Sequence, residues 1–227
     1  MGGIAGCGSL ARAVSYHRAM LTAAQVFAFL LAAVLITATP GPDNLLVLGM
    51  GMSRGRAQGI AFGLGCALGC LSHTLLAVVG VSAMIAASPT AFTVLRWVGG
   101  AYLVWLGVQA LRSAGGARMD VAGQPPRPLR ALFARGLVAN AVNPKVVLFF
   151  LSFLPQFVVP SQGAVAWQLG VLGLVFTLQA AVLFGLLGYF AGAIGGWLQR
   201  RPRAGLWLDR IAGTVFVALG LKMVAGR

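Results

Sequence analysis

The sequence predicts an all-α membrane protein of six transmembrane helices, arranged as a 3+3 inverted repeat, with helices one and four broken. Of its 227 residues, 59% are hydrophobic and only 9% are charged, whereas soluble domains carry about 25% charged residues. Two proline-containing motifs interrupt apolar stretches at residues 39–44 and 140–145. The two halves of the chain also share an internal repeat. The net charge of +14 would suit nucleic acid, but the mean hydropathy of +0.90 excludes a soluble nucleic-acid binder.

Each predicted span is long enough for a hydrocarbon core, which needs about 20 apolar residues. The spans lie at residues 21–52, 58–87, 91–111, 136–159, 164–198 and 206–225. Pro40 and Pro42 break the first span and Pro144 breaks the fourth, because proline removes a hydrogen bond and clashes with the preceding turn. Residues 112–135, with Gly115-Gly116 and Pro125-Pro126, form the predicted long loop.

Basic residues predict the orientation. Eleven arginines lie in the loops after spans one, three and five, and none lies in the loops at residues 88–89 and 160–161. Because cytoplasmic loops carry the excess of Lys and Arg, residues 112–135 are expected in the cytoplasm and both termini outside. Trp97, Trp105, Trp197 and Trp207 lie near span ends, as expected of an aromatic belt.

The N-terminus conflicts with this orientation, because Arg12 and Arg18 precede the first span. We therefore expect translation to start at Met20, which makes residues 1–19 a dispensable extension and residues 20–227 a single domain of six transmembrane helices. A signal peptide cleaved near residues 37–39 is the alternative, but its apolar region exceeds the usual 7 to 15 residues or so.

The internal repeat relates the two halves. A shift of 104 residues aligns Pro40 with Pro144 and Gly69 with Gly173, and a shift of 113 aligns Gly100 with Gly213 and Gly107 with Gly220. Each copy holds three spans, an odd number, so the copies face opposite ways across the membrane. Inverted repeats with broken helices in matching positions are typical of secondary transporters.

Four motifs resemble the LysE/RhtB family of amino-acid exporters. They lie in order at residues 39–44 (Thr-Pro-Gly-Pro-Asp-Asn), 96–107, 140–145 (Asn-Ala-Val-Asn-Pro-Lys) and 153–157. The resemblance covers the chain from Met20 onward. It implies a transporter, not an enzyme, that uses no cofactor and exports an amino acid or derivative across the bacterial inner membrane by proton antiport.

The two breaks supply suitable chemistry for an amino acid. Asn143 is a good N-cap and Pro144 a good first helical residue, and Thr39-Pro40 offers the same pairing in the first half. Helix N-termini attract a carboxylate, Lys145 adds a positive charge, and freed carbonyls with Asp43 suit an ammonium group. The candidate substrate-binding residues are Thr39, Pro40, Gly41, Pro42, Asp43, Asn44, Asn140, Asn143, Pro144 and Lys145.

Proton coupling is assigned to Asp43 and His73. Asp43 is the only acidic residue placed inside the membrane, since Asp120 and Asp209 are expected in loops. His73 lies in the second span, where family members often carry a histidine, although it could equally be a core residue. Asp43 and Lys145 could instead form a static ion pair, Lys145 could snorkel to an interface, and the prolines could be kinks without a ligand.

Cys66, Cys70 and His73 share one face of the second span and raise the alternative of a soft-metal site, and with it a heavy-metal or ion exporter. Metal sites usually draw ligands from several helices, and small cysteines commonly pack in cores, so no metal is assigned. A thiol–disulfide carrier would need cysteines near both breaks, and neither break has one. Glycines at 55, 59, 63, 65 and 69 permit close helix contacts within the subunit or in a homo-oligomer.

Overall fold

The computed structural model describes residues 21–113 and 127–225, which contain helices and no strand. The predicted extension at residues 1–19 and the glycine and proline pairs of the long loop lie outside this part of the chain.

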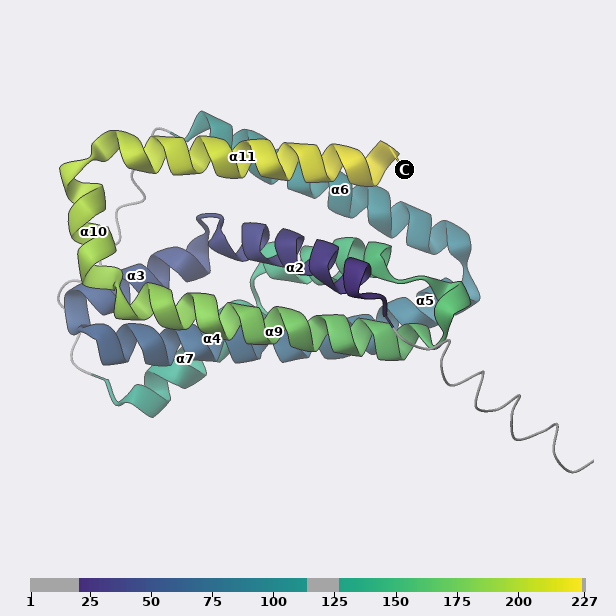
Figure 1. Cartoon of the computed structure of the whole chain (residues 1–227), viewed down its shortest axis with the longest axis horizontal. Coiled ribbons are helices and arrows are strands. Elements are labelled where there is room, and N and C mark those ends of the chain that lie inside the picture. The colour runs from purple at the N-terminus through teal and green to yellow at the C-terminus, as the bar shows by residue number, and fades with distance from the viewer. Residues whose placement is uncertain (1–20, 114–126, 226–227) are drawn as a thin grey trace, which may run out of the picture.

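Within each half of the chain the helices follow one another with few intervening residues (Figure 1). The first half holds α2 (Ala23–Ala38), α3 (Pro42–Arg54), α4 (Arg56–Leu76), the π-helical η2 (Ala77–Val81), α5 (Ser82–Ala87) and α6 (Pro89–Arg112). The second half holds α7 (Leu129–Ala141), α8 (Pro144–Leu148), the π-helical η3 (Phe149–Phe153), the 3₁₀ segments η4 (Leu154–Phe157) and η5 (Pro160–Gln162), α9 (Val165–Tyr189), α10 (Ala191–Arg200) and α11 (Pro202–Ala225).

The chain breaks after α2. Thr22 begins α2 with a capping box, and α2 and α3 meet at a bend of 58°. The expected pairing of Thr39 with Pro40 as a helix start is wrong. Thr39 is the C-cap of α2 and its hydroxyl donates to the Leu35 carbonyl oxygen, while α3 starts at Pro42 behind the N-cap Gly41. Pro42 is the first residue of α3. Proline suits this position because its backbone angle φ is already helical and the N–H that it lacks would have no partner there.

The second break follows the prediction more closely. Asn143 is the N-cap of α8, where its side-chain oxygen accepts from the Lys145 backbone N–H at 3.1 Å, and Pro144 is the first helical residue. The bend between α7 and the segment Pro144–Phe157 is 51°. Because α7 begins at Leu129, Arg130 and Arg135 lie in a helix and not in the predicted loop.

Two further boundaries are corrected. The fifth span was expected to run to residue 198, but α9 ends at Tyr189 and α10 is a separate helix across the end of the bundle (Figure 1). Apolar residues continue through this turn, so hydropathy alone does not detect it. Asp209 was expected in a loop, but it lies in α11, because Pro202 starts that helix ahead of the apolar run.

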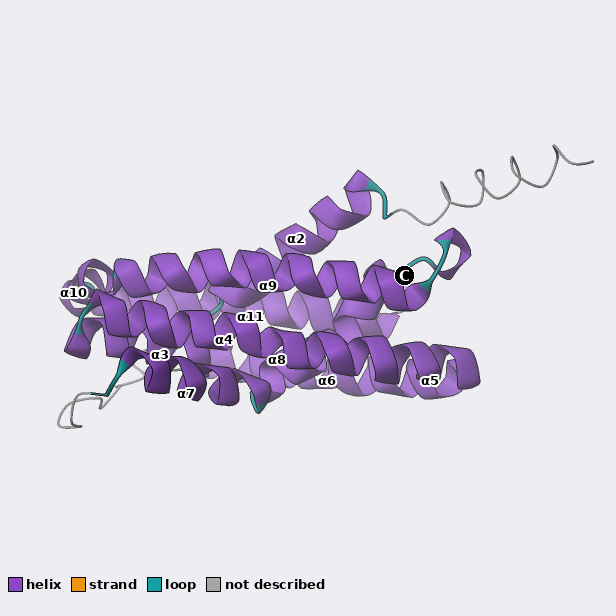
Figure 2. Ribbon diagram, turned by 90° about the horizontal axis from the view of Figure 1, so that it is seen from below, coloured by secondary structure: helices purple, strands orange, loops and turns teal. Residues whose placement is uncertain are grey.

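Within the part of the chain that the structure describes, four helical segments are long and apolar enough to cross a membrane, or six if each bent pair forms one span. The four are Arg56–Met84, Thr90–Arg112, Val165–Tyr189 and Arg203–Ala225. Figure 2 shows α4, α9, α6 and α11 running along the long axis of the bundle. The core between them is aromatic, with Phe29, Phe149, Phe150 and Phe176 all buried and in ring contact.

Glycines set the closest helix contacts. A Cβ on Gly107 would lie 2.7 Å from the Gly213 carbonyl oxygen, and one on Gly213 would lie 2.6 Å from the Gly107 carbonyl oxygen, where α6 crosses α11. On α9, a Cβ on Gly188 would lie 2.6 Å from the Gly59 carbonyl carbon of α4. The predicted close packing of the glycine-rich second span thus occurs within the subunit.

Candidate functional site

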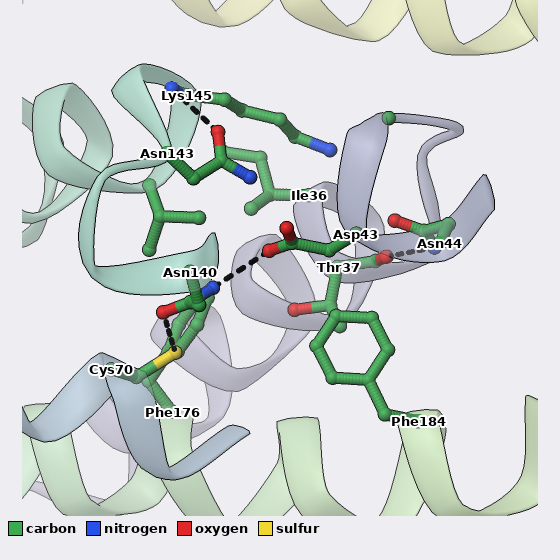
Figure 3. Close-up of a pocket in the computed structure, with 12 residues that line it drawn as sticks. Ile36, Thr37, Asp43, Asn44, Cys70, Asn140, Asn143, Lys145, Phe176 and Phe184 are labelled. Atoms are coloured by element: carbon green, nitrogen blue, oxygen red, sulfur yellow. Dashed lines mark hydrogen bonds between the residues drawn. The ribbon is translucent and has the colours of Figure 1, made fainter. Parts of the chain in front are cut away.

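A small cavity lies between the two helix breaks (Figure 3). About 20 Å³ of it is open to the centre of a water molecule, enough for about one water and not for an amino acid. The residues around it are Ile36, Thr37, Gly41, Asp43, Asn44, Cys70, Asn140, Asn143, Lys145, Val146, Phe176 and Phe184. Six of the ten candidate substrate-binding residues are in this set, while Thr39, Pro40, Pro42 and Pro144 form the breaks behind them.

Asp43 supplies the negative charge of the cavity. It is only 4% exposed and lies in the first turn of α3, where the helix dipole stabilises an anion. Its Oδ2 accepts a hydrogen bond of 2.7 Å from the Asn140 side-chain amide. The first half of the chain is therefore joined to the second by a buried carboxylate–amide contact.

Lys145 supplies the positive charge. It is 8% exposed, so it does not snorkel to a surface, and its Nζ donates to the Thr39 carbonyl oxygen at 2.9 Å. The Nζ also lies 5.2 Å from the centroid of the Phe216 ring, a cation–π distance. Across residues 21–113 and 127–225 no ion pair joins Lys145 to Asp43, which is hydrogen-bonded to Asn140 instead, so the static-pair alternative does not describe this structure.

Gly41 makes room for the lysine. A Cβ at Gly41 would lie 3.2 Å from the Lys145 Nζ, so any larger residue there would press on the ammonium group. The shift of 104 residues that defines the repeat makes Gly41 the counterpart of Lys145. The two breaks therefore meet at matching positions, with a glycine on one side and a lysine on the other.

Asn140 connects the cavity to the second span. Besides donating to Asp43, its side-chain oxygen accepts from the Cys70 thiol at 3.4 Å, and its backbone oxygen lies 3.0 Å from His73 Nε2. Because a carbonyl oxygen only accepts, Nε2 carries the proton in this contact. Asn140 thus touches both residues to which proton coupling was assigned.

His73 lies behind the cavity and not on its wall. It is 1% exposed, packs against the Phe150 ring, and reaches Asp43 only through Asn140. Its Nδ1 is buried without a hydrogen-bond partner. Such an orphan polar atom is unusual in a protein interior.

The thiols of Cys66 and Cys70 are free and buried. Among the described residues no group of three His, Cys, Asp or Glu side chains is arranged to hold a metal ion. Cys70 lines the cavity through its contact with Asn140, a position that its spacing to Cys66 and His73 did not suggest.

Two of the backbone carbonyls freed at the first break are already occupied. The Thr37 oxygen accepts from the Asn44 side chain at 2.8 Å, and the Thr39 oxygen accepts from Lys145. Lys145 thus holds a place expected for the ammonium group of a substrate. Thr37 was missed, although a polar residue one turn before a proline break was a usable signal. Phe176 and Phe184 come from α9, and no local pattern points from there to the breaks.

Comparison with known proteins gives one consistent family. The family model of the LysE type translocator matches residues 16–227. A homoserine/homoserine lactone efflux protein of Salmonella typhimurium is 30% identical over 88% of this chain and 96% of its own. An uncharacterised membrane protein of Vibrio cholerae is also 30% identical, over 88% and 96%. A leucine efflux protein of Klebsiella pneumoniae is 27% identical over 86% and 92%. No solved structure matches.

Proposed function

The chain belongs to the LysE type translocator family, and on that basis we propose that it exports a small neutral amino acid or derivative across the bacterial inner membrane by proton antiport. The cavity between the breaks carries this proposal, because it places one buried carboxylate and one buried ammonium group beside apolar walls. An α-amino acid has the complementary pair of charges. The names of the two efflux relatives, for homoserine and for leucine, agree with such a substrate.

The charges favour a neutral side chain on the substrate. Asp43 is the only carboxylate among the described residues that line the cavity, and binding the α-ammonium group uses it. A cationic side chain would then be buried without a partner, which is costly. The remaining wall, formed by Ile36, Val146, Phe176 and Phe184, suits an apolar or short polar side chain.

Lys145 is proposed to bind the substrate carboxylate. In this structure its ammonium group is held by the Thr39 carbonyl oxygen, and the cavity is too small for an amino acid. Substrate entry must therefore widen the cavity. It must also move the Lys145 ammonium group from the Thr39 carbonyl oxygen, which is neutral, to the substrate carboxylate, which is charged. A carboxylate carries a full negative charge and a carbonyl oxygen only a partial one, so the buried ammonium group is attracted more strongly to the substrate carboxylate than to the Thr39 carbonyl oxygen.

Asp43 is proposed to carry the coupled proton. When the substrate ammonium is bound, Asp43 stays ionised as its partner. After the substrate has left, a proton takes its place on Asp43, so that the return step does not carry an uncompensated buried charge. The proton and the substrate ammonium group cannot occupy the Asp43 carboxylate at the same time, and antiport requires this mutual exclusion. Asn140 and His73 extend the buried polar contacts of Asp43 towards the second span.

Alternating access is proposed to follow from the inverted repeat. Two glycine contacts between α6 and α11 support this arrangement. Gly100 approaches the carbonyl oxygen of Gly220, and Gly107 approaches that of Gly213. A shift of 113 residues aligns Gly100 with Gly213 and Gly107 with Gly220, so it maps each of these contacts onto the other. A two-fold relation between the halves requires this exchange. Counting each bent pair as one span gives the six that this plan needs.

Transport by the purified full chain in proteoliposomes tests the proposal. Counterflow of radiolabelled homoserine, leucine, threonine and lysine should show uptake of at least one neutral amino acid and little uptake of lysine. Release of the internal neutral substrate should accelerate when a proton gradient is imposed across the vesicle. Exchange of lysine alone, or transport that is indifferent to the proton gradient, would contradict the proposed substrate class or the proposed coupling, respectively.

A further inference from the structure

A groove is lined by residues at the turn from α10 into α11. This turn is at the opposite end of α10 from its junction with α9 (Figure 1). It encloses about 1200 Å³ of space including its open side. Two arginines, Arg201 and Arg203, lie at its polar part, and Trp197, Trp207, Leu208 and Ile211 form most of its apolar wall. None of these residues contributes to the cavity between the helix breaks.

The lengths of the helices around the groove predict that it lies at the level of a membrane surface. With ten residues, α10 is far too short to cross a bilayer, which needs about 20, and it runs crosswise beside α9 and α11, which are both long enough to cross. Trp197 is 48% and Trp207 61% exposed. Tryptophan with such exposure is typical of the headgroup level of a bilayer.

Among the described residues, the arginines of the groove have no acidic partner. No salt bridge to Arg201 or Arg203 is formed within residues 21–113 and 127–225, and the nearby Asp209 is not part of the groove wall. Arg203 and Arg210 lie two turns apart on α11, with Trp207 between them. The Arg210 guanidinium lies 5.8 Å from the centroid of the Trp207 ring. Guanidinium groups bind phosphate with two parallel hydrogen bonds.

We propose that this groove binds an anionic phospholipid, with the headgroup phosphate at Arg201 and Arg203 and an acyl chain along Trp207, Leu208 and Ile211. The charge selects an anion, and the exposed apolar wall that continues along α11 selects a lipid over a free phosphate. Basic pockets beside transmembrane helices commonly bind anionic lipid headgroups. A bound lipid would fix the angle between α10 and α11.

Lipid titration of the full chain tests this site. Phosphatidylglycerol binding to the detergent-purified protein is measured by native mass spectrometry, with the variant R201Q/R203Q and the matched control R130Q/R135Q. The control removes the same charge from exposed positions of α7. We expect R201Q/R203Q to weaken phosphatidylglycerol binding about 10-fold or more, and the control to change it by less than about 2-fold. Phosphatidylcholine should bind the wild type and R201Q/R203Q equally.

Three results would overturn the proposal. They are equal losses in the two variants, no loss in R201Q/R203Q, and displacement of the lipid by an equal concentration of glycerol 3-phosphate, which would indicate a simple anion site. If R201Q/R203Q does not fold, the proposal is tested by the thermal stability of the wild type and of R203K. Phosphatidylglycerol must raise the thermal stability of the wild type above that in phosphatidylcholine, and R203K, which keeps the charge without the paired hydrogen bonds, must lose part of that rise.

Discussion

At the scale of residues, the candidate site consists of two buried opposite charges that are held apart. Asn140 holds Asp43 at 2.7 Å, and the Thr39 carbonyl oxygen holds Lys145 at 2.9 Å. The two charges do not pair with each other, so each can bind the oppositely charged group of an amino acid. This separation is the physical difference between a binding site and a structural ion pair.

Replacing Lys145 by alanine should weaken binding selectively. The substrate carboxylate would lose its buried cationic partner, at a cost of about 2 kcal/mol or more, or roughly 30-fold in affinity. Affinity for the free amino acid and for its methyl ester should be measured by isothermal titration. The ester, which lacks the charge, should lose much less, and an equal loss for both would argue that Lys145 acts only through the fold.

Asp43 and Asn140 should be energetically coupled. Thermal unfolding of Asp43→Asn, Asn140→Ala and the double variant forms a double-mutant cycle. Because each side chain is the other's buried partner, the coupling energy should reach about 1 kcal/mol, within the range of about 0.5–3 kcal/mol for residues in contact. Strictly additive effects would show that the contact contributes nothing to the folded state.

Part of the site was predictable from the chain. Proline breaks in apolar stretches identified Asp43, Asn140, Asn143 and Lys145, and these residues line one cavity. Cys70 and Phe184 were not assigned to it, because they reach the cavity from α4 and α9, and no local pattern records which distant helix packs on a break.

At the scale of elements, proline and glycine determine the helix geometry. Asn143 and Pro144 start α8 as their residue types predict. The first break differs, since Gly41 and Pro42 start α3 while Thr39 caps α2. The turn into α10 was missed because apolar residues continue through it. Hydropathy predicts whether a segment can be buried in lipid, and it carries no information about the direction in which the chain runs.

The α4–α9 contact provides a matched pair of glycine substitutions three residues apart. Gly188→Ala places a methyl group 2.6 Å from the Gly59 carbonyl carbon, whereas Gly185→Ala meets nothing within 4 Å. Overpacking of this kind costs about 1–3 kcal/mol, while alanine favours the helix by up to about 1 kcal/mol. Thermal unfolding in detergent should therefore show loss of stability for Gly188→Ala and none for Gly185→Ala. Similar behaviour of the two variants would contradict the packing described for these helices.

At the scale of the whole molecule, composition and motifs identified a multi-pass membrane protein of the LysE type translocator family. The inverted repeat and the orientation remain predictions. They depend on arginine counts and on the glycine contacts between α6 and α11, and both are open to measurement.

Cysteine labelling of intact cells addresses the orientation. In a cysteine-free background, a single cysteine at Ser113 should be protected from an impermeant thiol reagent and one at Pro89 should be labelled, because the arginine-rich loops are expected inside. Labelling of permeabilised cells provides the control for accessibility. Labelling at Ser113 with protection at Pro89 would invert the molecule in the membrane.

Proton-driven export by Asp43→Asn is the most direct test of the central claim, that one carboxylate between the helix breaks alternates between a proton and the substrate ammonium group. The measurement compares two activities in the same proteoliposomes, release of a neutral amino acid driven by a proton gradient and substrate exchange without a gradient. The asparagine cannot release a proton, so gradient-driven release should be abolished while exchange stays measurable. Undiminished gradient-driven release by Asp43→Asn, at wild-type protein levels, would contradict the account.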